Sequence, residues 1–180
     1  MDKVKRYIPY LLLTGLTLFF CRIFVGRYGI FGAKVDWLSQ HSVLPDYFRQ
    51  QFYATGKIFP EFAPNLGGGQ NIYHFAYYGL YSPLILPSYL LPFVKMSDYI
   101  MVISITGLTV SVLLFYYWLK SRKMDTGVAF IISLMFLLAG PMIGQYSGQI
   151  MFVDYMPFLC LALIGVDRYF EQEKSGLFTV

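Results

Sequence analysis

Two aspartates stand where a carboxylate could do chemistry, and Asp36 is the first. It lies in the stretch Lys34-Val35-Asp36-Trp37, shortly after the first apolar segment. On a helix it would share a face with Gln40, four residues further on. Such a carboxylate can take a proton from an attacking hydroxyl group or bind a divalent cation. An exposed loop acid or a helix cap would look the same, and spacing alone does not separate these interpretations.

Asp154 is the second, and its apolar surroundings make its charge costly. It follows Ile150-Met151-Phe152-Val153 and precedes Tyr155-Met156-Pro157, about one turn inside an apolar segment. An Asp at the centre of a membrane helix costs roughly 2.5–3.5 kcal/mol, so acids in such places usually face a cavity and mark function. The alternative is a structural cap on a helix whose first turn holds Pro157.

A glycine-rich segment offers bare backbone and two amide side chains. It reads Asn65-Leu66-Gly67-Gly68-Gly69-Gln70-Asn71. Around Gly68 a sugar or phosphate can approach the main chain closely, with Gln70 and Asn71 beside it. The Lys and Ser/Thr of a P-loop are absent. A run of this kind is more often simply a turn.

Basic, histidine and tyrosine side chains are the remaining candidates for binding. Arg49 could bind a lipid phosphate, although a solvated charge or a headgroup anchor is the default interpretation of such a residue. His41 and His74 lack metal-ligand spacing, and each is expected to be a hydrogen-bonding histidine at the surface. The tyrosines between residues 73 and 81 could stack on sugar rings or form an interfacial aromatic belt.

The composition indicates that lipid is the solvent of this chain. Of the 180 residues 57% are hydrophobic and only 13% are charged, and the mean hydropathy is +0.54. Soluble domains carry about 25% charged residues. The net charge of +4 comes from Lys and Arg at segment ends, which suits a membrane interface and not nucleic acid. Cys21 and Cys160 each lie in an apolar run, so neither a disulfide framework nor a thiolate metal site is expected.

Four apolar stretches, each expected to be a transmembrane helix, position these residues: 7–25, 99–119, 127–144 and 150–166. The first is longer than the apolar part of a signal peptide and does not end in small residues, so an uncleaved anchor is expected. A further stretch, 77–94, is interrupted by Pro83, Pro87 and Pro92. Proline removes a backbone donor, so this stretch is expected to be re-entrant or interfacial.

Clustered basic residues set the expected orientation. Lys3, Lys5 and Arg6 precede the first span, and Lys120, Arg122 and Lys123 lie in a short loop. Positive residues stay in the cytoplasm, so the N-terminus and this loop are expected there. Asp36 and Asp154 then share the outer side.

The sequence therefore predicts a single all-α, polytopic membrane domain. We expect a cytoplasmic N-terminus and first helix over residues 1–26, an external loop with interfacial helices over 27–98, three further spans over 99–170 and a cytoplasmic tail over 171–180. One interfacial helix is expected to start at Pro45-Asp46, with Leu44, Phe48 and Phe52 at a spacing of four and Gly56 just past its end.

Several motifs taken together resemble the start of the YfhO family of bacterial membrane proteins, a likeness that runs along nearly the whole chain. They are Asp36-Trp37 with Gln40-His41, Asp46-Tyr47-Phe48-Arg49-Gln50, the glycine-rich segment 65–71, Tyr81-Ser82-Pro83 and Met151-Phe152-Val153-Asp154. The family is similar to the GT-C class of glycosyltransferases, which are membrane enzymes with many helices. Its proteins are several times longer, so this chain is expected to be an N-terminal piece.

The resemblance implies an activity and a set of site residues. GT-C enzymes transfer a sugar from a polyprenyl-phosphate donor outside the cytoplasm, and family members are associated with glycosylating cell-wall polymers such as teichoic acids. Asp36 and Asp154 match the acids of the first and second external loops, as catalytic residues or, together, as ligands of a divalent cation. The expected substrate-binding residues are Gln40, His41, Arg49, Gly68, Gln70 and Asn71.

These expectations place the protein in the bacterial cytoplasmic membrane, with the bilayer, a lipid-linked sugar and an envelope polymer as its partners. Two other classes of function stay open. In a lipid or polymer exporter, Asp154 would belong to a polar pathway. In a structural subunit, both acids would be caps.

Overall fold

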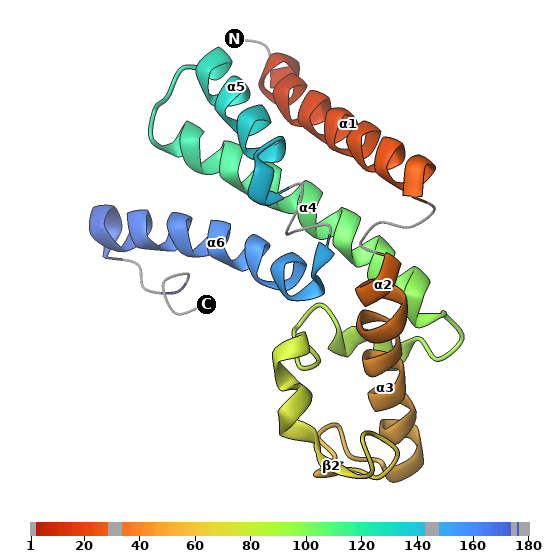
Figure 1. Ribbon diagram of the computed structural model, residues 1–180. Coiled ribbons are helices and arrows are strands. Elements are labelled where there is room, and N and C mark those ends of the chain that lie inside the picture. Colours follow the sequence, from red (N-terminus) through yellow and green to blue (C-terminus); the bar gives the residue numbers. More distant parts are fainter. Residues whose placement is uncertain (1–2, 29–33, 143–147, 174–175, 177–180) are drawn as a thin grey trace.

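The chain is almost entirely helical in a computed structural model that describes residues 3–28, 34–142, 148–173 and 176 (Figure 1). The α-helices are α1 (Lys3–Tyr28), α2 (Lys34–Asp36), α3 (Val43–Thr55), α4 (Met96–Ser121), α5 (Thr126–Leu137) and α6 (Ile150–Gln172). Shorter turns are the π-helical η1 (Trp37–His41) and the 3₁₀-helical η2 (Ile72–Tyr78) and η3 (Leu86–Leu90). The strands β1 (Phe62–Ala63) and β2 (Gln70–Asn71) form a two-residue antiparallel pair. The predicted helical class is therefore confirmed.

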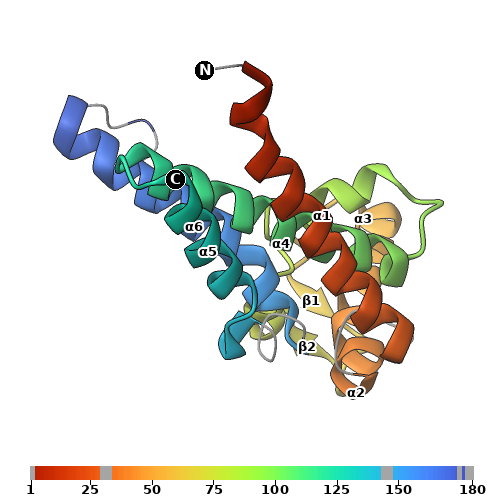
Figure 2. The same cartoon turned by 90° about the horizontal axis from the view of Figure 1, so that it is seen from above.

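α4 is the central helix of a bundle against which α1, α5 and α6 pack (Figures 1 and 2). The buried face of α4 is largely aliphatic and meets buried residues of α1 and α5 in one core, which includes Leu13, Ile100, Leu108, Val112, Ala129 and Leu137. Aromatic rings fill the edges of this core, where Tyr10 and Tyr116 meet edge to face with ring centres 4.9 Å apart. The bundle thus has one apolar interior.

Small hydroxyl residues let the helices approach closely without leaving polar groups unpaired. Ser104 and Ser111 of α4, Thr17 of α1 and Ser133 of α5 are all buried. Each donates its hydroxyl hydrogen to the carbonyl four residues earlier, at 2.6–2.8 Å. An unpaired buried hydroxyl would cost about 1–3 kcal/mol, and small residues at helix contacts are typical of packing inside membranes.

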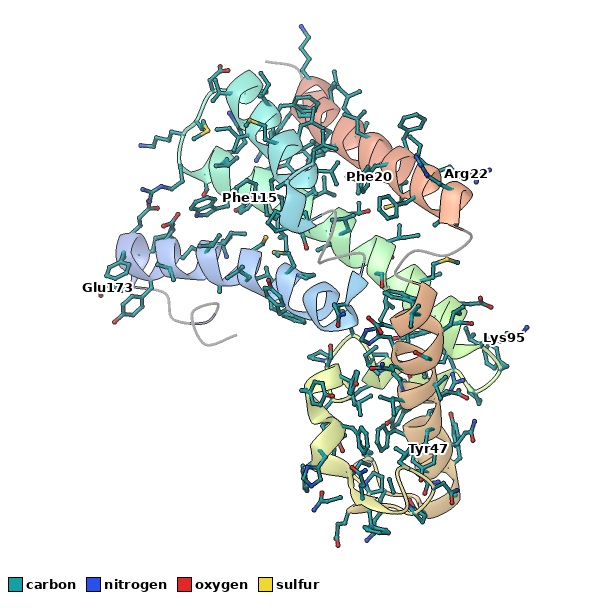
Figure 3. All side chains as sticks on the ribbon, in the orientation of Figure 1. Phe20, Arg22, Tyr47, Lys95, Phe115 and Glu173 are labelled. Carbon is teal, nitrogen blue, oxygen red and sulfur yellow. The ribbon has the colours of Figure 1, made fainter. Side chains whose placement is uncertain are left out.

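Two helices of the described part are long and apolar enough to cross a membrane, Lys5–Arg27 and Met96–Ser121. Side chains of α1 that do not face α4 are apolar and exposed, for example Leu11 and Phe19, as expected of a surface in contact with lipid. The labelled charged residues Arg22, Lys95 and Glu173 lie near the ends of helices in Figure 3, whereas Phe20 and Phe115 lie along them. Two of the four predicted spans are thus supported.

The third and fourth predicted spans differ from the helices observed. α5 has 12 residues, about 18 Å, whereas a span needs about 20 residues. Residues 143 and 144 of the predicted stretch lie outside the described residues. α6 has 23 residues with Pro157 inside and Asp167 and Arg168 near its end, and it extends past the predicted limit at residue 166.

The segment between η1 and α4 forms a small unit beside one end of the bundle, as predicted for a loop with short helices (Figure 1). α3 begins two residues before Pro45, and proline is tolerated in a first helical turn. It ends at Gly56, whose φ of 71° is left-handed and whose amide donates to the carbonyl of Phe52 at 2.8 Å. Leu44 and Phe48 pack against Ile72 and Leu80.

The proline-interrupted stretch 77–94 contains turns and η3, and it forms no helix long enough to span a membrane. Pro87 lies at the start of η3. Tyr99 of α4 donates its hydroxyl hydrogen to the carbonyl of Leu84 at 2.7 Å, which fixes the stretch to the start of α4. The expected break in the helix is confirmed, and its cause is the absence of proline amide donors.

Hydrogen bonds between side chains fasten the end of α6 to the end of α4. Trp118 donates its indole Nε1–H to Oδ2 of Asp167 at 2.8 Å, and Nη1 of Arg122 lies 3.2 Å from Oδ1 of the same carboxylate. Arg168 donates to the hydroxyl oxygen of Tyr117 at 3.2 Å. We call the five residues of these three contacts the clasp: Tyr117, Trp118, Arg122, Asp167 and Arg168.

The start of α1, the α4–α5 loop and the end of α6 lie at the same end of the bundle (Figure 1). Lys5 of α1 and Lys120 of α4 line a common cavity there. α2 and the start of α6 lie at the other end. These three elements thus share one end of the bundle, and the side of the membrane that this end faces stays a prediction.

Cysteine labelling tests the orientation directly. We expect single cysteines at positions 57 and 122 to react with a membrane-impermeant maleimide from opposite sides, because the loop with Arg122 is basic and position 57 belongs to the small unit at the other end. Intact and permeabilised cells are compared, in a variant with Cys21 and Cys160 replaced by Ser. Labelling of both positions from one side would contradict the fold as a membrane bundle.

Candidate functional site

Asp36 is positioned by the junction between α2 and η1. It is the last residue of α2, and the next residue, Trp37, is 1% exposed and belongs to the core of the bundle. The amide of Ser42 closes η1 by donating to the carbonyl of Trp37 at 3.0 Å. π-helical turns are rare and often occur at functional sites. The buried indole thus fixes the backbone while the neighbouring carboxylate stays partly exposed.

Gln149 brings the start of α6 to this carboxylate. Its Nε2 lies 3.4 Å from Oδ2 of Asp36, a long hydrogen bond between residues 113 positions apart. α6 also packs against η2. Two of the predicted external regions, around Asp36 and at the start of α6, therefore meet.

Asp154 lies in the first turns of α6, five residues after Gln149. Five residues of α-helix rise about 7.5 Å. Its side chain lies outside the described residues. Its position in the helix therefore places its backbone near the Asp36 region, and the shared use of the two carboxylates stays a prediction.

Gln40 and Tyr78 form the second polar contact of the site. The hydroxyl group of Tyr78 donates to Oε1 of Gln40 at 2.6 Å. The adjacent Tyr77 side chain, burial and the charge of Asp36 raise the pKa of Tyr78 to about 12. The Tyr78 hydroxyl therefore stays protonated at neutral pH and acts as a donor.

His41 is buried, so its predicted place at the surface is wrong. It is 1% exposed and lies between Trp37 and Tyr78, with ring centres 6.2 and 5.7 Å away. Neither ring nitrogen has a hydrogen-bond partner in the part of the chain that the structure describes. Burial lowers the pKa of His41, although Asp36 and Gln149 act in the opposite direction. The sequence signal failed because a surface position was inferred from polarity alone.

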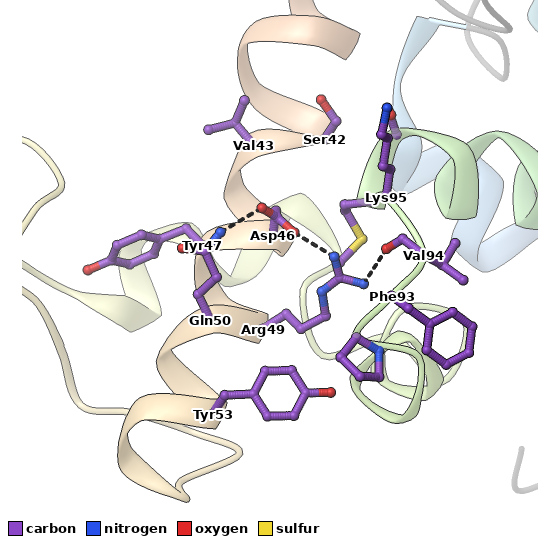
Figure 4. Close-up of a pocket in the computed structure, with 13 residues that line it drawn as sticks. Ser42, Val43, Asp46, Tyr47, Arg49, Gln50, Tyr53, Phe93, Val94 and Lys95 are labelled. Carbon is purple, nitrogen blue, oxygen red and sulfur yellow. Dashed lines mark hydrogen bonds and ion pairs between the residues drawn. The ribbon is translucent and has the colours of Figure 1, made fainter.

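Arg49 is also buried, at 6% exposed, and its donors are directed at the protein (Figure 4). Nη1 donates to the carbonyls of Leu91 and Val94 at 3.1 and 2.9 Å, and Nη2 lies 2.7 Å from Oδ1 of Asp46. These bonds join α3 to the turn before α4. A structural role explains each of them, and the predicted role in binding substrate has no support from this geometry.

A cavity of about 680 Å³ opens beside Arg49 (Figure 4). On the wall of this cavity, Oδ2 of Asp46 accepts a hydrogen bond from Nε2 of Gln50 at 2.8 Å. Lys95 and Phe93 lie across from α3 in the close-up. The cavity is separate from Asp36, whose contacts are with Gln149.

The glycine-rich segment forms the turn between β1 and β2, as the simpler interpretation predicted. Gly67, Gly68 and Gly69 all have positive φ, and a Cβ at Gly69 would lie 2.7 Å from Cζ of Phe62. Gln70 and Asn71 follow in β2. In Figure 1 this turn is at the far end of the small unit from α2, so the structure does not bring these predicted binding residues to Asp36.

One residue of the site, Gln149, was missed at the level of sequence, and Tyr78 was expected to stack on sugars or at the interface and not to bond to Gln40. The signal for Gln149 was its position as a polar residue immediately before an apolar helix, five residues from Asp154. Among the described side chains, no group of three or more His, Cys, Asp or Glu could hold a metal ion. The expected divalent cation is therefore untested.

Comparison with known proteins identifies a family of membrane proteins. The family model described as "Bacterial membrane protein YfhO" matches residues 8–180. No curated protein and no solved structure matches the chain.

Replacing Arg49 tests its structural role. We expect Arg49→Met to lower the free energy of unfolding by roughly 3 kcal/mol, because two carbonyls and the Asp46 carboxylate lose their partner. Lys57→Met is the matched control, since its ion pair with Glu61 is exposed and 3.8 Å long, and it should change stability by less than about 0.5 kcal/mol. Thermal and denaturant unfolding in detergent measure both, and equal effects would exclude the role.

The buried His41 predicts a dependence of stability on pH. Its pKa in the unfolded chain is about 6.5, and in the folded chain it is lower. Between these values the unfolded chain binds more protons, so stability should be full above about pH 6.5 and fall as the solution is acidified. Unfolding is measured at several pH values from 7.5 to 5. His41→Gln should reduce the dependence of the free energy of unfolding on pH, whereas His74→Gln, at an exposed position, should leave it unchanged. A wild-type slope that survives in His41→Gln would contradict this.

Proposed function

The chain belongs to the YfhO family of bacterial membrane proteins, and on that premise we propose that it is part of a membrane glycosyltransferase. The donor is a sugar linked to polyprenyl phosphate, and the acceptor is a cell-envelope polymer of the teichoic-acid type. Transfer takes place on the outer face of the cytoplasmic membrane. Nucleotide sugars are absent there, so a lipid-linked donor is the chemical alternative.

The contact between Asp36 and Gln149 is the observation that carries this proposal. It joins the segment after α1 to the start of α6, the helix that contains Asp154. Asp36 and Asp154, which are far apart in sequence, therefore belong to segments that are in contact. Both acids were singled out because their residue type and their setting suit proton transfer at a membrane surface.

The basic end of the bundle supports an outer location for Asp36. The start of α1, which holds Lys5, and the end of α4, which holds Lys120 and is followed by Arg122, lie at the end of the bundle opposite α2. Basic residues in short loops stay in the cytoplasm, so the Asp36 end would face outward. A polyprenyl phosphate carries its sugar at the membrane surface, within reach of residues at a helix end.

In the proposed reaction Asp36 is the general base. Its carboxylate takes the proton of an acceptor hydroxyl, the hydroxyl oxygen attacks the anomeric carbon, and the bond from that carbon to the phosphate oxygen breaks. Polyprenyl phosphate leaves with the electron pair, and the configuration at the anomeric carbon inverts. A positioned general base contributes typically 10²–10⁴-fold to the rate.

The neighbours of Asp36 suit that role. The Gln149 amide donates to one carboxylate oxygen and can fix its orientation. His41 is kept neutral by burial, so it does not compete as a cation for the carboxylate. Asp36 and Asp154 are the oxygen ligands that the chain offers to a divalent cation, which would stabilise the leaving phosphate.

The general-base role predicts the outcome of a conservative substitution. Asp36→Asn in the protein as it occurs in the bacterium should lower sugar transfer by at least about 100-fold, because an amide cannot accept the proton. Transfer is measured as sugar on the envelope polymer and, in membranes, as release of polyprenyl phosphate. The variant should be made and inserted normally.

Glu61→Gln is the matched control. It removes an acid from the exposed surface of the same small unit and should leave transfer unchanged. Normal transfer by Asp36→Asn would rule out its role as base. Loss of polymer export with sugar transfer intact would instead favour an exporter.

A further inference from the structure

A cavity of about 740 Å³ lies between α1 and α4 at the basic end of the bundle. It is far from Asp36 and takes no part in the proposed transfer. α1 supplies its first two turns and α4 its last turns. The lining residues are Lys5, Arg6, Pro9, Tyr10, Tyr116, Tyr117, Lys120, Ser121 and Thr126.

Three cationic side chains from two helices converge on this cavity. Lys5 and Arg6 are exposed residues of α1. Lys120 is fixed by two hydrogen bonds, from Nζ to the carbonyl of Met124 at 2.7 Å and to Oγ1 of Thr126 at 3.1 Å. An ammonium group has three donors, so one N–H remains beyond these two bonds. The cavity is a pre-arranged concentration of positive charge.

In the part of the chain that the structure describes, no acid forms an ion pair with Lys5, Arg6 or Lys120. Asp125 caps α5, and its Oδ1 accepts from the amides of Gly127 and Val128 at 2.8 and 3.2 Å. Asp167 and Glu171 are directed at Arg122, a residue outside the cavity lining. The walls are instead aromatic, from Tyr10, Tyr116 and Tyr117.

The cavity lies where a phospholipid would present its phosphate. Lys5 and Lys120 are within two residues of the ends of the two membrane-crossing candidates. The next turns of α1 expose Tyr7 and Leu11, an apolar surface along which acyl chains can lie. Phosphate oxygens accept from Lys and Arg in charge-assisted hydrogen bonds, and basic pockets between membrane helices on the cytoplasmic side bind anionic headgroups.

We propose that this cavity binds the phosphate of an anionic phospholipid headgroup, held by Lys5, Arg6 and Lys120. A free phosphate shares the recognition chemistry but has no acyl chains for the exposed apolar turns of α1. The bound lipid joins the start of α1 to the end of α4. The site is independent of sugar transfer.

Lipid titration in detergent tests the site without a membrane surface charge. The purified full chain in dodecyl maltoside is titrated with dioctanoyl phosphatidylglycerol, dioctanoyl phosphatidylcholine and inorganic phosphate. Native mass spectrometry counts bound lipid, and thermal unfolding reports binding to the folded state. We expect saturable binding of one phosphatidylglycerol, with at least tenfold weaker binding of the other two probes.

Charge removal locates the binding site. Each of Lys5→Gln and Arg6→Gln should weaken phosphatidylglycerol binding about fivefold, and the double variant by on the order of twentyfold. Lys123→Gln is the matched control, because it removes one exposed cation from the same end but does not line the cavity. It should change binding less than twofold.

Three results would overturn the proposal. Equal weakening by Lys123→Gln would show a general charge effect and no site. Binding of inorganic phosphate as tight as that of phosphatidylglycerol would assign the cavity to a free anion. Unchanged lipid binding in the folded Lys5→Gln/Arg6→Gln variant, with folding verified by circular dichroism, would place the lipid elsewhere.

Discussion

The architecture depends on one constraint, that polar groups buried among apolar helices must find partners inside the chain. α4 satisfies this constraint because the hydroxyl groups of its buried serines donate hydrogen bonds to carbonyls of the same helix. Serine side chains are small, so neighbouring helices can pack close to α4. α1, α5 and α6 all pack against α4. Everything at either end of the bundle is positioned by these contacts.

The candidate site is a consequence of that packing. Asp36 follows α1 and Gln149 precedes α6, and the two helices share α4 as a neighbour. Trp37 extends the core of the bundle into the small unit, which fixes the backbone beside Asp36. The family match gives no activity, so the chemical proposal rests on the resemblance to GT-C enzymes, on this junction and on the residue types that meet there.

Local features were predictable from the sequence, and long-range burial was not. The apolar runs of α1 and α4, the proline breaks and the end of α3 at Gly56 all follow from composition or from backbone preferences of single residues. The burial of His41 and Arg49 depends on partners up to 45 residues away. No local pattern records such partners, so both residues were expected to face solvent or substrate. The Gln149 contact spans 113 residues and was beyond sequence reasoning for the same reason.

α6 is fastened at both ends, by the clasp near Asp167 and by Gln149 near Asp36. An α-helix is stiff along its axis. Asp167 comes thirteen residues after position 154, which corresponds to a rise of about 20 Å along α6. The separation between residue 154 and the clasp is therefore set by the helix that joins them. Pro157 lies within this stretch and leaves one backbone carbonyl without its helical donor, so any bending of α6 is expected at this position.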